Sequence, residues 1–460
     1  MAQCTVSAPV SRSTAHASLA ALGVKLRQLD FLAPLREGVR IAQKTVKYSP
    51  FEKLTDCFIG ILAGAHGIVE INEGLRADPA LQAAFGRTAC AEQSVIQDTL
   101  DACTATNVTQ LEQAIDQIFR QQSRAAHHDF AQGELLADAD LSGMPCGKKA
   151  AFATKGYFAG TKNCRGRQLG RVLATDQDEI GVDALFAGNV ALVTALPRLV
   201  EAAERRLGLT PAQRARTILR VDAGGGSIGD LNWALERGYQ IHAKDFSSQR
   251  AQQLAQRVTT WYPDPKVAGR EAGVVPGPAP EYVREVRRIA VRCRMANGEW
   301  KAAVLVSTVA PETVQARTGQ PAASPDEPAA GVLADVYFYD QRGGGIETSV
   351  KEDKQGLGIT KRNKKRFEAQ QMLVGLGALA HNVLVWGREW LAPAAPLVRR
   401  YGIKRLVRDL FGVRGTVEID AAGRVCRIVL NQASRLAQRC LTAFQLLLAP
   451  AHVVVILGET

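Results

Sequence analysis

The chain has 460 residues, too many for one compact core, and a usual size of about 150 residues per domain predicts roughly three domains or one elaborated one. Hydrophobic residues make up 46% and charged residues 22% of the chain, an ordinary globular composition that excludes wholesale disorder. Lysine and arginine number 57 against 45 acidic residues, a formal net charge of +12. Polyanions, meaning nucleic acid or an anionic membrane surface, are therefore the expected partners.

No segment is expected to cross a membrane. The most apolar stretch, 443–458, is interrupted by Gln445, Pro450 and His452, and it predicts a buried helix followed by a buried strand. The first residues show neither a basic start nor a sustained apolar run, so a secretory signal is not expected. Nine cysteines occur without a CxxC pair, which argues against a disulfide framework and a structural zinc site. We expect a reduced, cytoplasmic protein.

Helices are predicted throughout the first 130 residues. Asp78 and Pro79 look like a helix cap followed by proline at the first helical position. Thr109 and Glu112 have the spacing of a capping box ahead of a helical apolar pattern. The pattern is equally compatible with a DNA-reading module and with a dimerisation or packing bundle.

The character of the chain changes near residue 134. Residues 134–144 predict a strand that ends in acidic residues, and residues 148–174 then contain cations without a single acidic residue. Such a run suits contact with phosphates, because a surface that binds a nucleic-acid backbone needs repeated positive charges; a solvated basic loop is the alternative. The cations are Lys148, Lys149, Lys155, Lys162, Arg165, Arg167 and Arg171, with Tyr157 and Phe158 interleaved.

The middle of the chain alternates strands with loops. Residues 217–222 and 239–245 predict strands on either side of a turn and helix, and the Pro- and Gly-rich segment 262–281 predicts a loop. Asn297-Gly298 joins two predicted strands, and this dipeptide favours a hairpin with a type I′ turn. A second loop is predicted at 311–331. Residues 246–332 are therefore expected to form a β-rich insertion.

Strand and helix signals return after this insertion. Residues 333–340 predict a strand, the three glycines that follow predict a break, and a helix is expected from near Ile346. The basic cluster 361–366 is compatible with DNA contact or with a solvated helix start. Residues 369–386 predict a long apolar helix, and residues 415–430 predict a last hairpin.

One glycine motif has the spacing of a dinucleotide fingerprint. Gly224, Gly226 and Gly229 follow a predicted strand and open a helix, and Asp245 ends the next strand. An NAD(P)-dependent oxidoreductase is therefore an alternative. The carboxylate of Asp222 at the strand end would repel a pyrophosphate, and an antiparallel hairpin follows in place of further βα units, so this alternative ranks second.

Three acids at strand and helix ends form the stronger combination. They are Asp140, Asp222 and Glu347, the last of which follows the three glycines. Carboxylates are hard oxygen ligands that suit Mg²⁺ or Mn²⁺, and three of them can hold two ions for the in-line displacement of a phosphoryl group. Asp138 competes with Asp140 as the first ligand, because alternate residues of a strand share a face.

The short motifs around these acids resemble those of a known enzyme family. Asp140-Leu141-Ser142 resembles the D-x-[ST] motif, and residues 220–227 the second-aspartate turn, of DDE-type transposases of bacterial insertion sequences. Tyr339, Arg342, Glu347 and Lys354 resemble the Tyr-Arg-Glu-Lys signature of the branch that carries a β insertion. The resemblance runs from about residue 50 to the last predicted hairpin.

The resemblance implies an α/β fold: a ribonuclease H-like catalytic core interrupted by a β-rich insertion, with an N-terminal helical domain. The expected parts are 1–130 (N-terminal helical, DNA-binding or dimerisation region), 131–245 (first part of the core), 246–332 (insertion), 333–395 (second part of the core with the acidic helix) and 396–460 (C-terminal hairpin and helix).

The implied activity is that of a DNA transposase. The enzyme would bind the terminal inverted repeats of its element and catalyse metal-dependent DNA cleavage and strand transfer. Asp140, Asp222 and Glu347 would be catalytic and would bind two Mg²⁺ or Mn²⁺ ions. The expected partners are double-stranded DNA of the transposon ends and target, and a second copy of the chain in a synaptic homodimer. The expected location is cytoplasmic and nucleoid-associated, without a membrane.

Further residues are expected to contact DNA: Tyr339, Arg342, Lys351, Lys354, Lys155, Arg165 and Trp300. Trp300 has two interpretations, stacking on a flipped base or packing in the insertion. Four residues separate Arg342 from Glu347, one more than in the family, so the helix is expected to start later, with Glu347, Lys351 and Lys354 on one face. A catalytically inactive DNA-binding relative is a further alternative.

Overall fold

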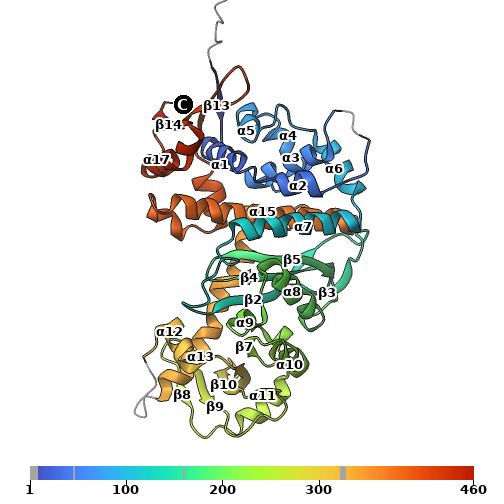
Figure 1. Cartoon of the computed structure of the whole chain (residues 1–460). Helices are drawn as coiled ribbons and strands as arrows, with labels where there is room; N and C mark the ends of the chain where they lie inside the picture. Colours follow the sequence, from blue (N-terminus) through green and yellow to red (C-terminus); the bar gives the residue numbers. More distant parts are fainter. Residues whose placement is uncertain (1–8, 45–46, 159–160, 322–327, 460) are drawn as a thin grey trace, which may run out of the picture. The chain divides into compact units, whose positions relative to one another are not determined.

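The computed structural model describes residues 9–44, 47–158, 161–321 and 328–459, without the side chains of Tyr157 and residues 161–163. It is a mixed α/β structure with two β-sheets (Figure 1). The chain divides into two compact units. The first unit comprises residues 1–123, 145–153 and 349–460, and the second unit comprises residues 124–144 and 154–348.

Helices dominate the first unit. They are α1 (Ala17–Gln28), α2 (Ala33–Gly38), α3 (Pro50–Leu62), α4 (Glu70–Glu73), α5 (Pro79–Ala84), α6 (Gln93–Ala102), α7 (Ala105–Gln122), α14 (Thr348–Gly356), α15 (Phe367–Leu391), α16 (Ile403–Arg405) and α17 (Arg435–Leu448), with short turns η3 (Pro396–Arg400), η4 (Leu406–Leu410) and η5 (Ala449–Ala451). The helical prediction for the first 130 residues is confirmed, except that Val10–Thr14 forms strand β1.

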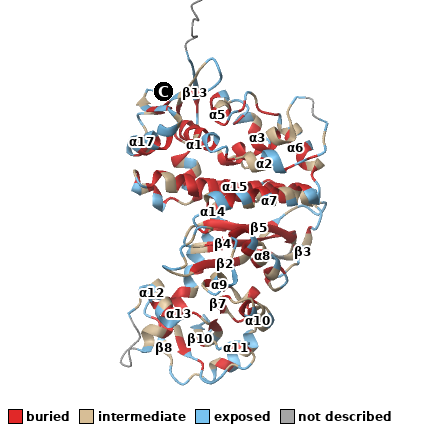
Figure 2. Ribbon diagram, viewed as in Figure 1, coloured by how far each residue is buried: buried red, intermediate tan, exposed pale blue. Residues whose placement is uncertain are grey.

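Helix α15 is the core of the first unit. Its sequence is apolar on every side, which is typical of a buried helix, and it packs against α3, α6 and α7. Figure 2 shows it buried along most of its length. Trp386 is 2% exposed and packs against Phe31 and Phe119, with ring centroids 6.1 and 6.2 Å away. The predicted long apolar helix is confirmed.

A four-stranded sheet completes the first unit. Its order is β1-β12-β13-β14, with β12 (Gly415–Ile419), β13 (Val425–Asn431) and β14 (Val454–Gly458). The predicted last hairpin is confirmed by the antiparallel β12–β13 pair. The predicted final strand is present, but the prediction that it is buried is wrong. Val455 is 2% exposed, whereas Val454 is 50% exposed. Only one face of β14 is covered, because α17 packs on one side.

Two local predictions in the first unit have different outcomes. Asp78 caps α5, with its Oδ1 accepting a hydrogen bond from the Leu81 backbone N–H at 2.8 Å, as predicted. The capping box predicted at Thr109 is wrong, because α7 begins earlier and is capped by Thr104 and Asn107. The sequence rule looks for Glu or Gln at the third helical position, and here Asn107 fills that role.

The basic cluster 361–366 is part of the fold of the first unit. Arg362 is 4% exposed, and its Nη1 donates to the Ala65 carbonyl at 2.7 Å. Lys364 donates to the Gln97 side chain, and Arg366 donates to the Asp101 carbonyl. Neither DNA contact nor a solvated helix start, the two interpretations made from the sequence, predicts these packing contacts, because both place the whole cluster on the surface.

The second unit is built on a ten-stranded sheet. Its order is β3-β4-β2-β6-β7-β11-β10-β9-β8, and β5 also pairs with β4. The strands are β2 (Leu135–Pro145), β3 (Thr154–Phe158), β4 (Thr161–Ala174), β5 (Glu179–Ala187), β6 (Thr217–Val221), β7 (Gln240–Lys244), β8 (Tyr262–Pro263), β9 (Arg270–Val274), β10 (Arg287–Arg294) and β11 (Trp300–Ser307). The helices are α8 (Leu192–Leu207), α9 (Pro211–Arg214), α10 (Ile228–Glu236), α11 (Ser248–Ala255), α12 (Pro311–Thr318) and α13 (Pro328–Arg342).

Three parallel strands form the centre of this sheet. Strand β2 pairs in parallel with β6, and β6 pairs in parallel with β7, so the carboxyl ends of all three meet at one edge. Strand β11 pairs antiparallel with β7, and the insertion strands β8–β11 therefore extend the same sheet. The strands predicted at 134–144, 217–222 and 239–245 are confirmed.

The insertion contains more regular structure than predicted. The hairpin β10–β11 is confirmed, but its turn is not type I′, because only Gly298 (φ 84°) has a positive φ and Asn297 does not. Gly298 N–H donates to the Met295 carbonyl at 2.9 Å, as in a type I turn followed by a left-handed glycine. The loop predicted at 262–281 contains β8 and β9, and the loop at 311–331 contains α12. The Pro and Gly residues of these segments flank short strands and a short helix but do not prevent them from forming.

The strand predicted at 333–340 is wrong, because this segment belongs to helix α13. Its β-branched and aromatic residues suit a strand by composition. However, Leu333, Val336 and Tyr337 have helical spacing and pack against Ile289 and Leu305 of the sheet. Tertiary packing of this stripe decides the conformation.

The three glycines do not break the chain before a new helix. Residues Gly343–Glu347 form a π-helical turn, η2, between α13 and α14. A π turn accommodates one extra residue within a helix. The extra residue between Arg342 and Glu347 is therefore absorbed inside a continuous helical path, and the prediction of a later helix start is wrong.

The α/β class is confirmed by the two sheets and their helices. The ribonuclease H-like description and the five-part division of the chain stay predictions. None of the helices that the structure describes combines the length and apolarity needed to cross a membrane.

Candidate carboxylate site

Asp140 and Asp222 lie just beyond the last paired residues of the parallel strands β2 and β6. The prediction that Asp140 ends its strand is wrong, because β2 continues to Pro145. In the parallel β2–β6 pair, Asp138 lies opposite Arg220 and Ala139 opposite Val221. Asp140 and Asp222 are the next residue on each strand path, and since side chains alternate along strands they share the face of Asp138 and Arg220. The proximity expected from the sequence is thus built into the strand register.

The charge environment of Asp140 is consistent with this arrangement. Burial raises the pKa of Asp140 to about 6, and the negative charges of Asp222 and Glu347 raise it further, while Arg342 opposes the shift. Two carboxylates near a third disfavour its ionised form. The charges of Asp222 and Glu347 therefore both act on the carboxyl group of Asp140. Glu347 belongs to the helical turn η2 and is exposed.

A buried arginine that the sequence reasoning missed joins the three acid-bearing elements. Arg220 of β6 is fully buried, and its Nε and Nη2 donate to the two carboxylate oxygens of Asp138 at 2.7 and 2.8 Å. Its Nη1 donates to the Phe338 carbonyl of α13 at 2.6 Å. Asp138 precedes Asp140 by two residues, Arg220 precedes Asp222 by two, and α13 leads to Glu347. We call Arg220, Asp138 and Phe338 the arginine link.

The arginine link decides between Asp138 and Asp140. Asp138 is 0% exposed, and both of its oxygens accept from Arg220, with Thr175 donating a further hydrogen bond. Asp140 is partly exposed, and its Oδ1 accepts only from the Leu141 backbone N–H. Asp138 is therefore a structural residue, and Asp140 remains the candidate ligand.

Close packing of η2 against this link requires a glycine. A Cβ added to Gly345 would lie 2.8 Å from Thr175 Cγ2 and 3.0 Å from Asp138 Oδ2. Such distances are too short for an added methyl group without movement of its neighbours. Gly345 is a second residue that the sequence reasoning treated only as part of a break.

Arg342 and Tyr339 lie beside the three acids. Arg342 is 2% exposed, its Nη2 donates to the Ala139 carbonyl at 3.3 Å, and it lies 3.6 Å from Asp140 Oδ2. Burial is the main cause that raises the pKa of Tyr339 to about 12, so its hydroxyl stays protonated. Direct DNA contact by these two residues stays a prediction.

The donor set suits a hard divalent cation in its chemistry. Asp222 Oδ1 accepts from the Gly224 backbone N–H at 2.8 Å, but neither Asp222 Oδ2 nor the Glu347 carboxylate accepts a hydrogen bond from any described residue. Oxygen atoms of this kind are the ligands that Mg²⁺ and Mn²⁺ prefer. Within the described ranges, no three His, Cys, Asp or Glu side chains are gathered as a ready-made metal cage. Ion binding would therefore require side-chain rotation.

The basic run 148–174 divides into exposed and buried cations. Lys155 and Arg165 are exposed and lie directly opposite each other in the β3–β4 pair. The prediction of a continuous phosphate-binding surface is wrong for Arg167 and Arg171, both 1% exposed. Arg171 pairs with Asp183 of the next strand at 2.7 Å. The side chains of Tyr157 and Lys162 lie outside the described residues.

The other predicted DNA contacts are Trp300, Lys351 and Lys354. Trp300 is 40% exposed, and the Arg292 guanidinium lies 4.5 Å from its ring and 4.0 Å from that of Trp261. The contact with Arg292 favours the interpretation that Trp300 packs within the insertion. The Trp300 side chain nevertheless stays partly exposed. Lys351 and Lys354 are on α14, in the first unit.

The glycine motif at 224–229 serves packing of the sheet. A Cβ added to Gly226 would lie 1.8 Å from the Lys244 carbonyl oxygen, so the glycine is needed where the turn meets β7. Asp245 is 4% exposed and pairs with Arg250, which leaves it unsuited to bind a ribose. No observation favours the oxidoreductase alternative.

The raised pKa of Asp140 predicts a pH-dependent stability difference. For an acid whose folded-state pKa exceeds its unfolded value, stability falls as the pH rises from the ordinary carboxyl range through about 6. Asp140→Asn removes this loss, so with a chelator present the variant should be more stable than the wild type at pH 8 by about 1 to 3 kcal/mol. Denaturant unfolding at pH 4 should show no difference. A variant that is less stable at pH 8 would contradict this account.

Comparisons with known proteins give a structural likeness but no sequence match. No family model and no curated protein matches the chain. Among solved structures, the chain is similar to piggyBac transposase in a synaptic complex with hairpin DNA, with a TM-score of 0.45 and 11% identity, over 88% of this chain and 81% of that one. A similarity at this level carries no argument about fold or function.

Proposed function

We propose that the chain is a DDE-type transposase that cleaves DNA at the ends of its element and transfers the strand to target DNA with two Mg²⁺ or Mn²⁺ ions. The observation that carries the proposal is the arginine link: Arg220 bonds Asp138 and the Phe338 carbonyl and so joins the elements of Asp140, Asp222 and Glu347. The short motifs around the same acids give independent support.

The three carboxylates have distinct roles in this proposal. Asp140 offers oxygens from within β2 and Asp222 from the end of the neighbouring β6, and Glu347 offers both oxygens from the turn η2. The bound ions would activate the attacking oxygen and stabilise the leaving oxygen of an in-line phosphoryl displacement. Arg342, 3.6 Å from Asp140 Oδ2, lowers the pKa of Asp140 and favours the ionised, ligating form.

DNA is the partner that the charges suit. The net charge of +12 favours a phosphate backbone as partner, and Lys155 and Arg165 are exposed cations of the β3–β4 pair. Lys351 and Lys354 follow Glu347 on a continuous helical path and would add phosphate contacts. We include a homodimer in the proposal, because strand transfer needs both element ends in one complex.

The proposal is tested with the natural flanking DNA as substrate. The full-length protein is incubated with linear DNA that contains the coding region and its flanks, in Mg²⁺, in Mn²⁺ or in Ca²⁺. We expect cuts at two discrete positions outside the coding region with Mg²⁺ or Mn²⁺, and binding without cuts in Ca²⁺. Specific binding to both flanks without cleavage under any metal would identify an inactive relative. Absence of specific binding would overturn the proposal.

A further inference from the structure

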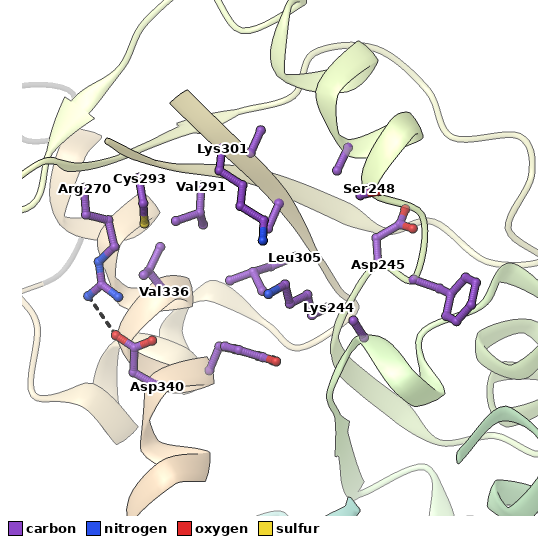
Figure 3. A pocket seen from close by; sticks show the side chains of 16 residues that line it. Lys244, Asp245, Ser248, Arg270, Val291, Cys293, Lys301, Leu305, Val336 and Asp340 are labelled. Carbon is purple, nitrogen blue, oxygen red and sulfur yellow. Dashed lines mark ion pairs between the residues drawn. The ribbon is translucent and has the colours of Figure 1, made fainter. Parts of the chain in front are cut away.

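A cavity in the second unit has no assigned role. None of the three acids lines it, but it adjoins them, because Ala223, which follows Asp222, and Tyr339, which lies beside the acids, are among its lining residues. Its volume is about 430 Å³, within the usual range for small-ligand sites of about 300 to 1,000 Å³. It is bounded by strands β10 and β11, by α13, and by the segment that follows β7 (Figure 3). The residues used below, Lys244, Lys301, Val291, Leu305, Val336 and Tyr339, all line it.

Two lysines give the cavity an uncompensated positive charge. Figure 3 shows the side chains of Lys244 and Lys301 extending toward the centre of the cavity from β7 and β11. Neither ammonium group forms an ion pair or hydrogen bond with any described residue. Two carboxylates also line the cavity, but Asp340 pairs with Arg270 at 2.7 Å and Asp245 pairs with Arg250. Lysines that converge in this way repel each other unless an anion lies between them.

The remaining wall is apolar and aromatic. Val291, Leu305 and Val336 cover the side between the sheet and α13, as Figure 3 shows. The Tyr339 ring and Phe246, which is 57% exposed, also line the cavity. Aromatic faces beside an apolar wall suit a flat group that is buried edge to face or by stacking. The cavity therefore combines an anion site with a site for a flat apolar body.

We propose that this cavity binds one nucleoside monophosphate unit, with the phosphate between Lys244 and Lys301 and the base against Val291, Leu305 and Tyr339. Either a free nucleotide or an unpaired nucleotide of a DNA strand has this chemistry. Binding requires neither the metal nor the three acids, so the proposal stands or falls independently of the strand-transfer function.

Cys293 offers a direct reporter of occupancy, because its thiol lines the same cavity and the residue is exposed. The full-length protein is alkylated with iodoacetamide, and the Cys293 peptide is quantified by mass spectrometry with and without thymidine monophosphate. We expect the nucleotide to slow alkylation with a saturable dependence on concentration. Lys301→Ala should weaken this protection at least about tenfold, since a hydrogen bond to a charged group contributes about 1.5 to 3 kcal/mol.

The matched control is Arg294→Ala, which removes an equal charge from the neighbouring strand outside the cavity. It should leave protection unchanged. A second arm uses a single-stranded oligonucleotide and the same strand with one abasic position. Protection by free nucleotide identifies a free ligand, and protection only by the base-bearing strand identifies a strand-held nucleotide. Absence of protection in both arms, or equal protection in Lys301→Ala, overturns the proposal.

Discussion

Asp222→Asn is expected to abolish metal-dependent DNA cleavage, with a loss of at least about 1,000-fold in rate, because a carboxylate that positions both ions is removed and each factor of ten costs about 1.4 kcal/mol of transition-state stabilisation. The fold should survive the change. Asp222 Oδ1 accepts from the Gly224 N–H, and asparagine keeps this oxygen and is an equally good cap.

The measurement is single-turnover cleavage of the flanking-DNA substrate, with binding followed separately in Ca²⁺. DNA affinity should stay within about threefold, since loss of one charge at a partly buried site changes binding little. Asp176→Asn is the matched control, because Asp176 belongs to the same unit and its side chain is 44% exposed. If Asp222→Asn keeps more than about a tenth of the wild-type rate, Asp222 does not have the proposed role.

Asp138→Ala is expected to cause the largest loss of stability, about 3 to 5 kcal/mol in the free energy of unfolding, because it leaves the fully buried Arg220 without its carboxylate. The neighbouring change Asp140→Ala should not cause such a loss, because ionised Asp140 is itself disfavoured in the folded state. Two acids only two residues apart should thus separate into a structural and a functional residue.

Denaturant unfolding of the two variants at pH 8 gives the comparison. The double variant with Arg220→Met should recover much of the stability lost in Asp138→Ala, since no buried charge then remains unpaired. A matched pair in which Asp138→Ala unfolds like the wild type and Asp140→Ala is strongly destabilised would show that the assignment is reversed.

The sequence was sufficient to place Asp140 and Asp222 on neighbouring parallel strands, as the β2–β6 register shows. The sequence put Asp140 at a strand end, whereas β2 continues to Pro145, and the role of both acids as ligands stays a prediction. The sequence was not sufficient to predict the arginine link. Arg220 and Asp138 are 82 residues apart in the chain, and their pairing depends on the β2–β6 register. The sequence did contain one signal: Arg220 is a charged residue in an otherwise apolar strand. A charged side chain that is buried needs an oppositely charged or hydrogen-bonding partner.

The place of Glu347 beside the two aspartates as a ligand stays a prediction, and its local structure differs from the one predicted. Counting residues reveals the extra residue after Arg342, yet only the structure shows that the π turn η2 absorbs it. Similarly, the composition of 333–340 suits a strand, and the contact of Leu333 and Val336 with the sheet makes it a helix. Local preference is overridden by packing in both cases.

The basic segment 148–174 shows that the sequence alone does not tell which charges are paired in the fold. The sequence shows that residues 148–174 contain no acidic residue. However, Arg171 forms an ion pair with Asp183 of the next strand, so counting the cations of this segment alone overestimates its net positive charge. Lys155 and Arg165 are the exposed cations of the β3–β4 pair.

Binding of Mn²⁺ at pH 8 tests the central claim most directly, because the account requires Asp140, Asp222 and Glu347 to hold ions together. Electron paramagnetic resonance should detect up to two bound ions per wild-type chain, as three carboxylates can hold. Asp140→Asn, Asp222→Asn and Glu347→Gln should each weaken binding at least about tenfold, since each removes a charged ligand. Unchanged Mn²⁺ affinity in all three variants would contradict the account.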